Sequence, residues 1–155
     1  MPDTDSRTQT RVTVEREPRH EEVAVVLAGL RAFNVERIGD MGFEPVTVFL
    51  RDGDDRVVGG LLGEIRWRWL YVSKLWVREA HRGGAGSRLM AAAEQHAAAH
   101  GCIGVFLDTF EFQARPFYER LGYEVFGTLE GYPPGYRQYY LAKRLAPPPP
   151  PSPND

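Results

Sequence analysis

A cluster of glycines between two arginines is the feature of the sequence that most directly suggests binding chemistry. Gly83, Gly84 and Gly86 lie between Arg82 and Arg88, at the start of an alanine-rich segment. The first amide hydrogens of a helix have no partner within it, and the helix dipole adds partial positive charge there. Glycines also let a ligand approach the backbone closely. The segment therefore predicts an anion site, such as a phosphate site, at a helix N-terminus.

Two common phosphate-binding patterns do not fit this loop. A P-loop needs Lys and then Ser or Thr after its last glycine, whereas Gly86 is followed by Ser87 and Arg88. The dinucleotide fingerprint needs a further glycine three residues after Gly86, where the chain has Leu89. Taken alone, the loop leaves two alternatives open: a phosphate site, and an ordinary helix entry without a ligand.

Few other side chains carry reactive or metal-binding chemistry in a suggestive pattern. His96 and His100 are four residues apart in an expected helix, which is the spacing of two metal ligands, but no third ligand is evident. We therefore predict a solvated helix face and no metal. Cys102 is the single cysteine and begins an apolar run, which favours a small buried side chain over a nucleophile.

Composition and charge are those of an ordinary soluble globular chain. The 155 residues carry a formal charge of −2, so charge alone gives no argument for a nucleic-acid partner. Apolar stretches fall far short of the roughly 18–20 residues that a membrane span needs, and the N-terminus has no apolar signal core. These features predict a cytoplasmic protein with neither a nucleic-acid nor a membrane partner.

The two ends of the chain differ in composition from its middle. Residues 1–10 are polar and are expected to be a disordered N-terminus. Residues 147–155 hold six prolines and are expected to be a disordered, extended tail. The folded domain is therefore predicted to span 11–146, which is one domain by size.

The pattern of apolar residues in 11–146 predicts an α/β (α+β) fold with strands that precede and follow a long helix. Period-two alternation and apolar runs predict strands at 11–16, 44–51, 57–67, 70–77, 103–109, 123–129 and 138–145. Helical spacing and capping residues predict helices at 20–34, 87–100 and 113–121. The second, third and fourth strands follow one another through short turns and should form an antiparallel meander.

Two segments resemble conserved blocks of the GNAT acetyltransferase superfamily. Residues 75–90 resemble its motif A, in which a strand leads into a glycine loop at the start of the acetyl-CoA helix. Residues 108–123 resemble a second block with the pattern Phe-Tyr-x-x-x-Gly-Phe/Tyr. The loop is one residue shorter than the family pattern, so His81 stands where the family has Arg or Gln.

The resemblance implies a fold, a cofactor and an activity. The fold would be a mixed central sheet of about seven strands, flanked by helices, with a V-shaped splay between the fourth and fifth strands. The cofactor would be acetyl-CoA, and the activity direct transfer of its acetyl group to a primary amine of a small molecule in a ternary complex. Acetylation of a protein or peptide, at a lysine or the N-terminus, and a non-catalytic CoA-binding module are the alternatives. Many relatives dimerise, so a homodimer is an expected option.

Catalytic and cofactor roles follow from the same resemblance. Tyr118 takes the place of the general acid, and Glu64 or Asp108 could be the general base, unless water relays serve instead. Glu64 could equally belong to a solvated ladder of alternating charges with Arg66 and Arg68. The residues that would hold the cofactor are Leu75, Trp76, Val77, Arg82, Gly83, Gly84, Ala85, Gly86, Ser87, Arg88, Gln113 and Phe117.

Aromatic side chains near the expected mouth of the site predict an acceptor with an apolar or cationic body. Ordinary core and rim positions would explain some of them equally well. The residues assigned to the acceptor are Phe33, Trp67, Tyr71, Tyr132 and Tyr136.

Overall fold

The computed structural model describes residues 10–146. The chain divides into two compact units, Met1–Asp40 and Met41–Asp155. The tail predicted at 147–155 lies outside the described residues, and so does the N-terminus predicted at 1–10 apart from Thr10. The extent of the folded domain stays a prediction. Among the described residues, no helix has the length and apolar character that crossing a membrane requires.

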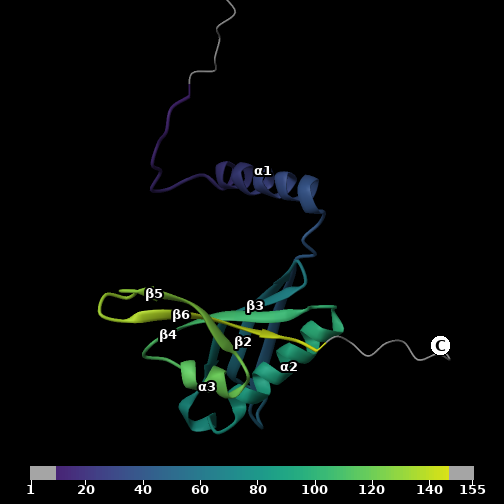
Figure 1. The fold of residues 1–155 in the computed structure, drawn as a ribbon, viewed down its shortest axis with the longest axis vertical. Helices are drawn as coiled ribbons and strands as arrows, with labels where there is room; N and C mark the ends of the chain where they lie inside the picture. The colour runs from purple at the N-terminus through teal and green to yellow at the C-terminus, as the bar shows by residue number, and fades with distance from the viewer. Residues whose placement is uncertain (1–9, 147–155) are drawn as a thin grey trace, which may run out of the picture. The chain divides into compact units, whose positions relative to one another are not determined.

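The described residues of the first unit contain one long helix, α1 (His20–Ile38), which is shown in purple in Figure 1. It begins after Arg19, whose side chain donates to Glu22 in the first turn at 2.7 Å, and it ends at Gly39 with a φ of 83°. The helix is longer than the predicted 20–34. The predicted strand at 11–16 is wrong: these residues have no strand partner among the described residues, and Val12 is 98% exposed.

The second unit is built on a sheet of six strands rather than about seven. They are β1 (Glu44–Arg51), β2 (Val57–Arg66), β3 (Trp69–Val77), β4 (Gly104–Phe110), β5 (Glu124–Glu130) and β6 (Arg137–Arg144), and they stand in the order β1-β2-β3-β4-β6-β5 (Figure 1). The predicted antiparallel meander of the first three is confirmed. The β3–β4 pair is parallel, because the chain crosses over through a helix between these strands.

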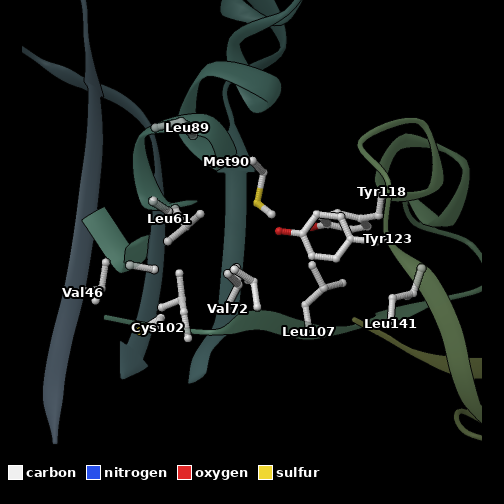
Figure 2. Packing of buried hydrophobic residues seen from close by; sticks show 14 of the residues in the cluster. Val46, Leu61, Val72, Leu89, Met90, Cys102, Leu107, Tyr118, Tyr123 and Leu141 are labelled. Carbon is white, nitrogen blue, oxygen red and sulfur yellow. The ribbon is translucent and has the colours of Figure 1, made fainter. Parts of the chain in front are cut away.

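Helices cover one face of this sheet. A short 3-10 helix, η1 (Glu79–His81), leads into α2 (Ala85–Ala99). The helix α3 (Arg115–Arg120) follows β4 and has Pro116 in its first turn, where the missing amide hydrogen costs little. α2 contacts β1 to β4, and buries Leu89, Ala93 and Ala97, which are four residues apart. In Figure 2 the sulfur of Met90 points toward the rings of Tyr118 and Tyr123. The core therefore fixes both α2 and α3 against the strands.

The predicted splay between the strands now labelled β3 and β4 is confirmed. Backbone pairing joins Trp69–Val72 to Gly104–Leu107 and then stops, although both strands continue. A bulge occurs at the same point, because Gly63 of β2 pairs with Val72 while Leu62 pairs with Lys74, so that Ser73 is an extra residue. The Ser73 hydroxyl donates to the carbonyl of Leu62 at 3.1 Å and fixes the bulge.

Gly63 is a position where the bulge requires glycine, and we expect Gly63→Ala to destabilise the fold. A Cβ there would overlap the backbone carbonyl oxygen of Tyr71, which cannot move without breaking the β2–β3 pairing. We expect a loss of about 1–3 kcal/mol in the free energy of unfolding, measured by urea denaturation. Gly53→Ala, in the β1–β2 turn with open space around it, is the matched control. Equal stability of the two variants would contradict this role of Gly63.

Candidate active site

A cleft of about 870 Å³ opens where β3 and β4 diverge. The second half of β3, the end of β4, the glycine loop and α3 form its walls. Most of the residues assigned to the cofactor line it, namely Leu75, Trp76, Val77, Arg82, Gly83, Gly84, Gly86, Ser87, Gln113 and Phe117. Ala85 instead packs into the core, and Arg88 lies exposed on α2 outside the lining.

The glycine loop ends at the first turn of α2 with its backbone open to the cleft. Gly83 and Gly84 have φ values of 99° and 85°, which side-chain-bearing residues rarely adopt, and a Cβ at either would meet nothing within 4 Å. Gly84 is the N-cap of α2. Gly86 has a different role, since a Cβ there would lie 3.1 Å from the ring of Phe117. The loop is therefore shaped to leave room for a ligand at the helix N-terminus.

Three basic side chains line the cleft and suit a ligand that carries phosphate groups. Arg82 is held by a bond from its Nε to the carbonyl of Val77 at 3.0 Å, which leaves its terminal nitrogens for a ligand. Lys74 and Arg120 were not singled out from the sequence. The bulge at Ser73 changes the direction in which Lys74 faces. Because the position of a bulge cannot be predicted from the sequence, Lys74 was missed. Arg120 could have been found, because it lies three residues after Phe117 on one helix face.

Tyr118 is positioned to donate a proton inside the cleft. It projects from α3, lines the cleft and is only 6% exposed, with its ring edge-on to those of Phe117 and Tyr123. Burial raises the pKa of the Tyr118 phenol to about 12, and the negative charge of Asp108 contributes to the shift. The phenol is therefore protonated at neutral pH and can act as an acid but not as a base.

Asp108 presents a fixed carboxylate at the point where β4 leaves β3. It follows Leu107, the last residue of β4 that pairs with β3, and it lines the cleft. The Tyr71 hydroxyl donates to Oδ1 at 2.5 Å, and the side-chain amide of Gln138 donates to Oδ2 at 2.8 Å. Two donors from neighbouring strands thus orient the carboxylate toward the cleft.

The Tyr71 phenol therefore acts as a support for Asp108 rather than as a free side chain. Its ring stacks on Phe106 with 4.9 Å between centroids, and its pKa is raised to about 12 by burial and then by the bond to Asp108. Gln138, which sequence reasoning missed, is buried and accepts from the Tyr140 hydroxyl at 3.1 Å. No local pattern identifies Gln138, because its role depends on the pairing of β6 with β4.

Glu64 lies outside the cleft lining. Its carboxylate accepts from Arg66 on the same strand at 2.9 Å, as in the expected ladder of alternating charges. Its register partner on β3 is Tyr71, so it stands one strand farther from the splay than Asp108 does. Of the two carboxylates considered for the base, Asp108 is the one that faces the cleft.

The five aromatic residues assigned to the acceptor fall into four places, of which the position of Tyr71 beside Asp108 is one. Tyr132 and Tyr136 lie in the β5–β6 loop. The ring of Tyr132 contacts that of Phe110, with 5.3 Å between centroids, and the ring of Tyr136 contacts that of Phe112, with 5.2 Å between centroids. The two phenylalanines stack on each other, line the cleft and were not predicted.

Trp67 does not belong to the lining of the cleft. Trp67 lies in the β2–β3 turn, beside the end of β3 that pairs with β4. Phe33 lies on α1 in the other unit, where Arg37 stands over its ring.

Comparison with known proteins gives one consistent family. The model described as "Acetyltransferase (GNAT) family" matches residues 15–123. The chain is 46% identical over 91 residues to a protein named blasticidin-S acetyltransferase from Streptomyces morookaense, covering 57% of this chain and 67% of that protein. It is 38% identical over 117 residues to Acetyltransferase Atu2258 of Agrobacterium fabrum (strain C58), covering 75% and 85%. The crystal structure of an acetyltransferase from Bacillus cereus superposes with a TM-score of 0.78 at 28% identity, covering 86% of this chain and 98% of that one.

The link between Asp108 and the two phenols can be measured directly. We expect Asp108→Asn to lower the pKa of Tyr71 toward the ordinary value near 10, because both the bond to a carboxylate and its charge favour the protonated phenol. The pKa of Tyr118 should fall less, since Asp108 acts on that phenol through its charge alone and not through a hydrogen bond. Titration of ¹³Cζ-labelled tyrosines by NMR measures both values. If the pKa values of Tyr71 and Tyr118 are both unchanged in Asp108→Asn, the interaction of Asp108 with these two phenols is refuted.

Proposed function

Since the chain belongs to the GNAT acetyltransferase family and is an acetyl-CoA-dependent N-acetyltransferase, we propose that its acceptor is a primary amine of a small molecule. Transfer is direct, in a ternary complex of protein, acetyl-CoA and acceptor. The observation that carries the proposal is one cleft that joins an anion-binding loop at one end to a proton donor and a carboxylate at the splay.

The residues of the cleft fit acetyl-CoA. The open backbone at Gly83 and Gly84, the first turn of α2 and the side chain of Arg82 would hold the pyrophosphate, with Lys74 and Arg120 available for further phosphate oxygens. Among the described residues, the edge of β3 beyond Val72 has no strand partner on the β4 side, so its backbone amides and carbonyls can bind the pantetheine arm. When bound, the cofactor supplies an activated acetyl thioester with a thiolate as leaving group.

Tyr118 and Asp108 supply the proton donor and the proton acceptor that the reaction needs. An alkylammonium has a pKa near 10, so the acceptor must lose a proton before its nitrogen can attack the thioester carbonyl. Asp108, oriented by Tyr71 and Gln138, accepts that proton directly or through one water. The bond from the nitrogen to the acetyl carbon would form, the carbon–sulfur bond would break, and the Tyr118 phenol would protonate the departing sulfur. The second proton that the acylated nitrogen loses would then pass to the Tyr118 phenolate, directly or through water, and restore the phenol.

The surroundings of Asp108 favour a compact amine over a peptide. The aromatic cluster of Phe110, Phe112, Tyr132 and Tyr136 lies at the same end of the cleft, and aromatic faces attract cations. Among the described residues that line the cleft, the charged ones are three bases and the single acid Asp108. A basic peptide would meet net repulsion there. The name of the 46% identical relative, which refers to a small molecule, supports the same class of acceptor.

The acceptor class is tested by coenzyme A release across a panel of amines. The panel should contain blasticidin S, aminoglycosides, polyamines, amino acids and lysine-containing peptides, with mass spectrometry to locate the added acetyl group. We expect at least one small amine to reach a kcat/KM of about 10⁴ M⁻¹s⁻¹, a usual lower value for a cognate substrate, and the peptides to stay well below it. A peptide preferred over every small amine would overturn the proposal in favour of a protein acetyltransferase. Binding of acetyl-CoA without transfer to any amine would favour a non-catalytic module.

The catalytic roles are tested by three single substitutions that keep side-chain shape. We expect Asp108→Asn and Tyr118→Phe each to lower kcat by about 10²–10⁴, because each removes a proton transfer. Glu64→Gln is the matched carboxylate control, since that side chain lies outside the cleft and pairs with Arg66. Calorimetry with coenzyme A should give near-normal affinity for all three. A larger loss in Glu64→Gln than in Asp108→Asn would assign the base to Glu64.

A further inference from the structure

A second group of chemically capable side chains lies at the other end of α2 from the glycine loop. It consists of Glu44, the first residue of β1, and of His96 and His100, one turn apart near the C-terminus of α2. The two histidines had been expected to form a solvated helix face. Glu44 is 52 residues away from His96 in sequence, and packing of α2 on β1 brings it to them.

The three side chains point ligand atoms at one another. Oε1 of Glu44 lies 3.1 Å from Nε2 of His96 and 3.6 Å from Nε2 of His100. Each residue offers one ligand atom, and these three atoms all lie within 4.8 Å of one another. The centroids of the two imidazole rings are 4.1 Å apart. Three donor atoms this close can share one metal ion after small rotations of their side chains.

A backbone contact already sets the tautomer that a metal ligand needs. Nδ1 of His100 lies 2.8 Å from the carbonyl oxygen of His96, so Nδ1 carries the hydrogen and donates it. The lone pair of the His100 imidazole is then on Nε2, the nitrogen that faces Glu44. Metal-binding histidines commonly donate their other ring N–H to a backbone carbonyl in this way, which fixes the direction of the ring.

From this geometry we propose that Glu44, His96 and His100 form a binding site for a divalent transition-metal ion of the Zn²⁺ type. Two imidazoles and one carboxylate suit Zn²⁺, whereas Mg²⁺ and Ca²⁺ prefer sets made of oxygen atoms. Side-chain exposures of 38%, 39% and 43% give the ion access from solvent and leave room for a water ligand.

The metal would act as a structural link rather than in acetyl transfer. His96 is twelve residues beyond Gly84, which corresponds to about 18 Å along the helix axis. None of the three ligands lines the cleft. An ion held by β1 and α2 would stabilise the folded state in proportion to its occupancy, because the unfolded chain does not hold the three ligands together.

The test uses the full chain without an affinity tag and with no acetyl-CoA, so that its result is independent of the acetyl acceptor. We expect Zn²⁺ to bind at one site by isothermal titration calorimetry and to raise the melting temperature, while Mg²⁺ does neither. His96→Ala, His100→Ala and Glu44→Gln should each weaken Zn²⁺ binding by at least about 10–100-fold, the loss that even supporting residues of metal sites produce. Co²⁺ should give visible absorption bands in the wild type that these variants lose.

Two further variants are the matched controls. His20→Ala removes a histidine of α1, and Cys102→Ala removes the buried thiol. Both should bind Zn²⁺ as the wild type does. The proposal is overturned if the wild type does not bind Zn²⁺, if His96→Ala and Glu44→Gln retain full affinity, or if either control loses as much affinity as the ligand variants.

Discussion

The site depends on the point where backbone pairing between β3 and β4 ends. Both strands continue past Val72 and Leu107, but the bulge at Ser73 takes β3 out of register and out of reach of β4. The bulge is possible because Gly63, on the neighbouring strand, has no Cβ to overlap the Tyr71 carbonyl. A cleft between two strands of one sheet results, and Asp108, the first residue of β4 beyond the pairing, faces it.

The helices convert this gap into a rigid site. α2 must present its N-terminus to the cleft, and its buried alanines and leucine hold it flat against the strands. Its Glu94 accepts from the Tyr123 hydroxyl at 2.8 Å and from Lys143 of β6 at 3.0 Å. These contacts tie α2 to the segment that follows α3 and to the sheet. Tyr118, held edge-on to Tyr123, is therefore positioned by the same core that positions the glycine loop.

Local patterns were enough to predict β1 with its true bounds, and the glycine loop, whose three glycines line the cleft. They failed where a partner distant in sequence decides the outcome. Residues 11–16 alternate like a strand but have no strand to pair with among the described residues. Gln138 supports Asp108 only through the pairing of β6 with β4, and Glu44 joins the two histidines only through packing of α2 on β1. Spacing along the chain carries no information about such contacts.

The arrangement of charge in the cleft argues for direct transfer between two bound substrates. Of the three bases in the lining, Arg82 belongs to the glycine loop, where the proposed anionic cofactor would bind, and Asp108 with its aromatic neighbours lies at the splay, where the proposed cationic amine would bind. The two ligands would therefore approach from different ends and meet beside Tyr118. A covalent intermediate on a thiol would need a cysteine there, but Cys102, the single thiol, is buried in the core outside the cleft lining, and burial raises its pKa. A phenol that stays protonated and a carboxylate held by two donors suit a single transfer step, in which one group accepts a proton while the other gives one.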